Sequence, residues 1–172
     1  MRNLEIFESP GLIVYPDRVK RNIAKVIEMV DGNPARLRPH IKTHKTKEGN
    51  DLLLAAGITK FKCATIAEAE MLGLLKAHNV LIAHQLMGPK LNRLVALIKS
   101  FPGTKFSCLI DNIETATSVS ILFGEAGLKI DVYMDVNIGM NRSGIITDKA
   151  TTLFKAAASL SNIKIIGLHC YD

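Results

Sequence analysis

Short apolar runs alternate with longer amphipathic segments along this chain, and this alternation is the feature that most constrains its fold. The runs that have the length and composition of β-strands cover residues 11–15, 35–42, 60–64, 80–84, 105–110, 130–136 and 163–171. The segments between them space their apolar residues as amphipathic helices do, for example at 17–30, 47–56 and 148–160. Strands that alternate with helices predict βαβ units and a parallel sheet.

Missing motifs narrow the choice among parallel folds. No Gly-x-Gly-x-x-Gly follows a predicted strand and no Walker A sequence occurs, which argues against a dinucleotide-binding or P-loop fold. The remaining architecture is a (β/α)8 barrel of the TIM type, which usually needs about 250 residues. Because the chain has 172 residues, we expect only the N-terminal part of a barrel. Such a chain could be a fragment, a partial gene product, or a half-barrel that assembles with another chain.

The composition excludes several classes of partner. A net charge of +6 favours anionic ligands, but no basic patch is interleaved with aromatic residues, so nucleic acid is not an expected partner. No apolar run reaches the roughly 18 residues that a membrane span needs, and the start of the chain does not resemble a signal peptide. Cys63, Cys108 and Cys170 each lie in an apolar stretch, which predicts buried thiols. We therefore expect a soluble, cytoplasmic protein.

An unusual polar cluster ends the second predicted strand. Strand alternation puts Arg38, His40 and Lys42 on one face, away from the apolar residues between them. Clustered cations cost free energy unless an anion or a covalent partner is present, and such surroundings make a lysine amine a nucleophile. The alternative interpretation is a solvated loop.

Two later strand ends carry further candidates, because function in parallel folds gathers where the strands end. Arg142 lies in a turn between Gly139 and Gly144, and its guanidinium suits a phenolate or a carboxylate. His169 and Tyr171 alternate with apolar residues and share one face of the last strand. The alternatives are that Arg142 is a surface residue and that His169 and Tyr171 merely fill the barrel interior. Weaker candidates at other strand ends are Thr65, His84 and Gln85.

Four segments together resemble one enzyme family. Residues 38–45, 60–70, 135–144 and 167–172 are similar, in order, to motifs of the D-threonine aldolase and D-serine dehydratase family. That family has the fold of the alanine racemase N-terminal domain and belongs to the fold type III pyridoxal-phosphate enzymes. The resemblance implies that the chain, 1–172, holds about six of the eight barrel strands. It also implies that residues 1–16 pack with a C-terminal β domain absent from this chain.

The resemblance also implies roles for individual residues. Lys42 corresponds to the Schiff-base lysine, with Lys45 as the competing candidate. Arg142 corresponds to the arginine at the phenolic oxygen of the cofactor, and Tyr171 lies where the family has a ring at the cofactor face. Further candidates for the cofactor pocket are His40, Thr65 and Gln85, and His169 joins Lys42 and Tyr171 as a catalytic candidate.

The activity implied is D-threonine aldolase-like cleavage of D-3-hydroxy amino acids to glycine and an aldehyde. D-serine dehydratase and amino acid racemase are alternatives within the same fold, and a pyridoxal-phosphate carrier or an inactive fragment is the non-enzymatic one. The family further implies a homodimer and a divalent metal whose ligands lie beyond this chain, so no residue here is assigned to a metal.

Overall fold

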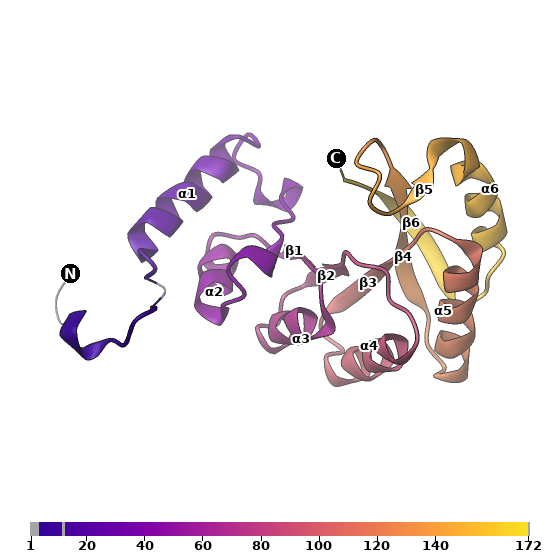
Figure 1. Ribbon diagram of the computed structural model, residues 1–172, viewed down its shortest axis with the longest axis horizontal. Coiled ribbons are helices and arrows are strands. Elements are labelled where there is room, and N and C mark those ends of the chain that lie inside the picture. The colour runs from indigo at the N-terminus through magenta and orange to yellow at the C-terminus, as the bar shows by residue number, and fades with distance from the viewer. Residues whose placement is uncertain (1–3, 12, 172) are drawn as a thin grey trace.

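The computed structural model describes residues 4–11 and 13–171, which form a parallel sheet flanked by helices. Figure 1 shows the helices along the outside of the curved sheet. The strands are β1 (Lys60–Cys63), β2 (Asn79–Ile82), β3 (Lys105–Ile110), β4 (Ile130–Asn137), β5 (Ile145–Ile146) and β6 (Ile163–Tyr171). The α-helices are α1 (Pro16–Glu28), α2 (Lys47–Ala55), α3 (Ile66–Leu74), α4 (Pro89–Ser100), α5 (Ile113–Glu125) and α6 (Thr147–Ala158).

Every strand pairing is parallel, so the carboxyl ends of the strands lie at one edge of the sheet. Strands β1 to β4 pair in sequence order, and β6 pairs with β4 along its whole length. The short β5 pairs with the last residues of β4. Because β6 already occupies one side of β4 there, β5 lies on the other side, in line with β3. The predicted architecture, the N-terminal part of a TIM-type barrel, is confirmed.

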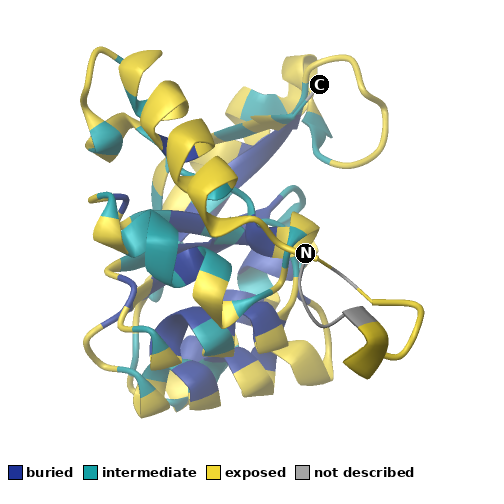
Figure 2. Ribbon diagram, turned by 90° about the vertical axis from the view of Figure 1, so that its left-hand side faces the viewer, coloured by how far each residue is buried: buried dark blue, intermediate teal, exposed yellow. Residues whose placement is uncertain are grey.

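The core lies between the strands and the inward sides of the helices (Figure 2). Phe61, Val80, Ile82, Ile110 and Val132 are completely buried strand residues. Their burial on a sheet covered by helices explains why these strands read as nearly continuous apolar runs. Burial also raises the pKa of the Cys63 thiol, and that of Cys108 to about 12, so both thiols are unreactive. Cys170 is exposed, which corrects the prediction for this residue, because alternate side chains of β6 point away from the core.

The predicted strand at 35–42 is not a regular strand. Two 3-10 helices, Pro34–Arg36 and Ile41–Thr43, occupy its two ends. Between them, the Pro39 carbonyl accepts the Lys62 N–H at 2.9 Å, and His40 forms a single parallel bridge with Lys62. Proline has no N–H to donate, so it cannot extend a ladder. The segment therefore lies at the edge of β1 in the place of a strand but with minimal pairing.

The predicted strand at 11–15 is also absent from the described residues. Residues 11 and 13–15 have no regular structure, and residue 12 lies outside the described part. Pro16 then begins α1, in agreement with the preference of proline for the first helical turn. The expected packing of 1–16 against a further domain stays a prediction. In the described ranges, no helix has both the length and the apolar character needed to cross a membrane.

Side-chain caps begin several of the helices. Thr65 Oγ1 accepts the Glu68 N–H at 3.1 Å, and Glu68 Oε2 accepts the Ala64 N–H at 2.7 Å. These two bonds form a capping box, shifted by one residue on its return bond. At the start of α5, Asn112 Oδ1 accepts the Thr115 N–H at 2.7 Å.

We predict that Thr65→Ala lowers the free energy of unfolding by about 1 kcal/mol, because the first turn of α3 loses its side-chain acceptor. Thr65→Ser keeps the oxygen and should retain most of the stability. Urea denaturation of the three proteins measures the difference. Equal losses in the serine and alanine variants would show that the methyl group, not the cap, is the stabilising part.

Candidate active site

A cavity of about 260 Å³ lies at the carboxyl edge of the sheet. Its walls come from the ends of β1, β2 and β6, from the 3-10 turn at 41–43 and from the loop after β4. The residues that line it are His40, Lys42, Lys62, Ala64, Ala83, His84, Gln85, Arg142, Ser143, His169 and Tyr171. The cavity thus brings together six candidates that the sequence analysis took from separate parts of the chain: His40, Lys42, Gln85, Arg142, His169 and Tyr171.

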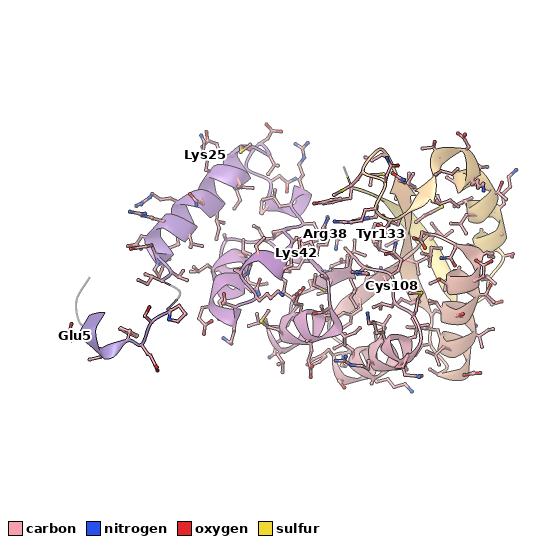
Figure 3. All side chains as sticks on the ribbon, in the orientation of Figure 1. Glu5, Lys25, Arg38, Lys42, Cys108 and Tyr133 are labelled. Atoms are coloured by element: carbon pink, nitrogen blue, oxygen red, sulfur yellow. The ribbon has the colours of Figure 1, made fainter. Side chains whose placement is uncertain are left out.

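Three cations surround the ring of Tyr171. The Arg142 guanidinium carbon lies 4.5 Å from the ring centroid, and the amines of Lys62 and Lys42 lie 5.6 and 5.8 Å from it. Contacts of this kind are favourable cation–π interactions. However, three cations around one ring repel one another, so the arrangement favours an anionic ligand. Figure 3 labels Lys42 near the middle of the view.

The structure separates Lys42 from its competitor Lys45. Lys45 adopts a positive φ of 50°, and its amine lies 3.7 Å from Glu68 Oε1. Its side chain is therefore turned toward the start of α3 and does not line the cavity. Lys42 lines the cavity, and the backbone N–H of Lys42 donates to His40 Nδ1 at 3.2 Å.

The buried side chain of Asp135 holds three of the residues that line the cavity. Its side chain is 3% exposed, and it accepts hydrogen bonds from His169 Nδ1 at 2.6 Å, Gln85 Nε2 at 2.7 Å and Ser143 Oγ at 3.0 Å. A buried carboxylate needs such donors because water is excluded. Ser143 follows Arg142 directly, so this bond holds the arginine-bearing turn against β4.

A second carboxylate supports the same turn. Asp111 Oδ2 accepts from Gln85 Nε2 at 2.9 Å and from the Gly144 N–H at 3.3 Å. Gly144 has φ +94°, and a Cβ there would lie 2.7 Å from the Asn137 nitrogen. Only glycine fits this close approach of two backbone segments. Gln85 therefore links both carboxylates and positions the loop at 139–144.

Lys62 is a site residue that the sequence reasoning missed. Its amine lies 3.5 Å from His169 Nε2, within the cavity. Burial lowers the pKa of Lys62, and the charges of Lys42, Arg142 and Arg38 lower it further, whereas Asp135 raises it. Its position in the sequence could have identified it, because a lysine between the apolar residues Phe61 and Cys63 is unusual in a strand of a parallel sheet. Both neighbours are completely buried in β1.

Arg38 lies one layer deeper than the cavity lining. Its guanidinium donates to Asn79 Oδ1 at 2.7 Å, to the Phe61 carbonyl at 3.3 Å and to the Tyr133 hydroxyl at 3.4 Å. Figure 3 labels Arg38 and Tyr133 side by side. Arg38 is thus satisfied by protein partners, whereas His40 and Lys42 line the cavity.

Thr65 does not line this cavity. Besides capping α3, it borders a neighbouring pocket that also contains His84 and Gln85. Its predicted contact with a cofactor stays a prediction. Within residues 4–11 and 13–171, no group of three or more His, Cys, Asp or Glu side chains is arranged to hold a metal ion.

Comparison with known proteins assigns the family. The profile of the family described as alanine racemase, N-terminal domain, matches residues 14–172. The chain therefore belongs to the alanine racemase N-terminal domain family. This membership agrees with the fold and with the resemblance inferred from the motifs.

Particular relatives are aldolases and dehydratases. The chain is 26% identical over 153 residues to D-threo-3-hydroxyaspartate dehydratase of Delftia sp., covering 89% of this chain and 40% of the relative. It is 26% identical over 168 residues to 3-hydroxy-D-aspartate aldolase of Paracoccus denitrificans, covering 96% and 43%. The crystal structure of D-threonine aldolase from Filomicrobium marinum superposes with a TM-score of 0.84 at 31% identity, covering 94% and 43%. The chain thus spans about two fifths of the length of these relatives.

We predict that the His40 ring stays neutral until the pH falls to about 4, because burial and the charges of Lys42 and Lys62 lower its pKa from 6.5. An unfolded chain would protonate this ring first. The stabilising contribution of neutral His40 is therefore complete above pH 6.5 and is lost as the pH falls toward 4.

Ring NMR signals of His40 measure its titration directly, and urea denaturation between these pH values measures the loss of stability. His40→Asn keeps an acceptor for the Lys42 N–H but does not titrate, so its stability should depend less on pH than that of the wild type. An identical pH dependence in both proteins would contradict the assignment.

Proposed function

We propose that this chain carries the cofactor-binding part of a pyridoxal-phosphate-dependent lyase that acts on D-3-hydroxy amino acids, with D-threonine aldolase-like cleavage to glycine and an aldehyde. The observation that carries the proposal is the convergence of Lys42 and Arg142 on the ring of Tyr171 inside one cavity. An amine, a guanidinium and an aromatic face are complementary to the aldehyde, the phenolic oxygen and the ring of this cofactor.

The residues present fit the cofactor. Its aldehyde needs an accessible amine, and Lys42 is an exposed residue at the cavity wall. Its negative charge suits a cavity where Lys42, Lys62 and Arg142 gather around Tyr171. When bound, pyridoxal phosphate supplies an electron sink for a bond broken at the Cα of the amino acid.

In this proposal, each of five residues at the site has a distinct role. Lys42 would hold the cofactor covalently, Arg142 would pair with its phenolic oxygen, and Tyr171 would support its ring. His40 orients the turn of Lys42 by accepting its backbone N–H. Gln85 holds the Arg142 turn through Asp111 and Asp135.

The dehydratase is a second candidate, since one relative is named a D-threo-3-hydroxyaspartate dehydratase. An amino acid racemase would use the same binding residues. We further propose that the longer protein is a homodimer and that a divalent metal binds outside the described residues, at the substrate hydroxyl. A pyridoxal-phosphate carrier or an inactive fragment, in contrast, would form no product from an amino acid.

We predict that pyridoxal phosphate added to the chain forms an imine that borohydride reduces onto Lys42. Lys42→Ala should abolish the visible absorbance of the imine, whereas Lys45→Ala should keep it, because Lys45 is directed to Glu68. Peptide mapping of the reduced protein identifies the modified lysine. An adduct on Lys45 would reverse the assignment, and no adduct on a folded chain would refute cofactor binding by this chain.

Products distinguish the candidate reactions. With D-threonine as the substrate of the protein loaded with cofactor, we expect glycine and acetaldehyde in equal amounts. Mass spectrometry of the products and an assay for ammonia provide the measurement. Formation of 2-oxobutanoate and ammonia would instead identify a dehydratase. L-allo-threonine, the Cα epimer of D-threonine, separated from the substrate by chromatography, would identify a racemase.

A further inference from the structure

The cavity contains a second lysine for which the proposed function has no task. Lys62 lies on β1, and its contact with His169 on β6 crosses the interior between strands that do not pair with each other. Within the described ranges, Lys62 forms no ion pair with a carboxylate. A half-buried amine at a ligand cavity, with no carboxylate to neutralise it, calls for a physical explanation.

Hydrogen bonds connect Lys62 to the buried Asp135. A carboxylate can only accept, so the 2.6 Å contact between Asp135 Oδ1 and His169 Nδ1 puts the ring hydrogen on Nδ1. The lone pair of neutral His169 is then on Nε2, which lies 3.5 Å from the Lys62 amine. The His169 side chain is 10% exposed, so it is fixed in this orientation between its two partners.

The charges around Lys62 make its proton easy to lose. The groups that face it are the cations of Lys42, Arg142 and Arg38, the carboxylate of Asp135 and the rings of His40, His169 and Tyr171. Cations outnumber carboxylates in this set. Because burial and these cations both lower the pKa of Lys62, its amine releases a proton more readily than an exposed lysine does.

We propose that Asp135, His169 and Lys62 form a proton relay in which Lys62 is the terminal acid–base group toward a ligand bound against Tyr171. The proposal rests on the function proposed above and deepens it by assigning a proton-transfer residue to that site. Lys42 and Lys62 then divide two tasks, since one holds the cofactor and the other moves a proton.

The step balances as a simple proton transfer. A C–H or O–H bond of the ligand breaks, its electron pair stays on the ligand, and the lone pair of the Lys62 amine forms the new N–H bond. The resulting ammonium passes a proton to His169 Nε2, and the imidazolium is stabilised by Asp135. Reversal of these transfers returns the proton to the ligand.

The first experiment tests the relay without cofactor. Lysine Cε and histidine Cε1 are labelled with ¹³C in the purified chain, and both are followed by NMR as the pH is changed. Lys62→Arg identifies the Lys62 signal by its disappearance. Because coupled groups titrate together, Lys62 and His169 should show shared midpoints, and Lys62→Met should remove the second step at His169. Independent single steps at the two residues would overturn the relay.

The second experiment measures proton transfer on a ligand. The chain loaded with pyridoxal phosphate is incubated with glycine in D2O, and exchange of the α-hydrogen is followed by NMR. Lys62→Met should slow exchange by about a hundredfold or more while the borohydride adduct on Lys42 is unchanged. Lys62→Arg keeps the charge but cannot release a proton, so it should not restore exchange. Lys60→Met is the matched control on β1, because Lys60 donates to the Ala35 carbonyl outside the cavity.

The outcomes separate the two proposals. Exchange at the wild-type rate in Lys62→Met, no exchange in the wild type despite a Lys42 adduct, or rescue by Lys62→Arg would each overturn the relay. Rescue by arginine would assign Lys62 to binding an anion. If no adduct forms on Lys42, the proposed function fails, and the coupled titration still decides whether the relay exists.

Discussion

The buried carboxylate of Asp135 is the interaction on which the arrangement of this cavity depends. A buried carboxylate is stable only when donors surround it, and Asp135 takes them from three different segments: His169 on β6, Gln85 after β2 and Ser143 in the loop after β4. Satisfying one charge therefore brings together parts of the chain that local structure alone would leave independent. The bond from Ser143 to this carboxylate thereby holds the Arg142 turn in place.

In contrast to the satisfied Asp135 carboxylate, the basic side chains at the cavity repel one another. Lys42, Lys62 and Arg142 are held around Tyr171, and Lys62 forms no ion pair among the residues that the structure describes. Cation–π contacts offset only part of their mutual repulsion. The fold thus supplies a buried carboxylate whose hydrogen bonds are satisfied. Beside it, within the described residues, lie three basic side chains that form no ion pair with a carboxylate. Binding of an anionic cofactor would relieve this repulsion, which links the free energy of folding to the occupation of the site.

The sequence was informative wherever local rules decide the structure. Strand alternation put His169 and Tyr171 on one face, and the convergence of parallel strand ends brought them together with Lys42 and Arg142. Strand alternation failed at 35–42, where Pro39 and the side chain of His40 replace ladder bonds with local ones. Asp135 and Lys62 were missed because each lies within an apolar strand, and their meaning comes from contacts across the barrel interior.

The positions of the two lysines explain why one site can use both. Lys42 is exposed on a 3-10 turn, where an aldehyde can reach it. Lys62 is half-buried on a paired strand, and His169 lies at its amine. A covalent anchor needs access, whereas a proton-transfer group needs a fixed orientation and a partner that accepts the excess proton. Exchanging the two positions would satisfy neither requirement, so the positions of the two lysines agree with the tasks proposed for them.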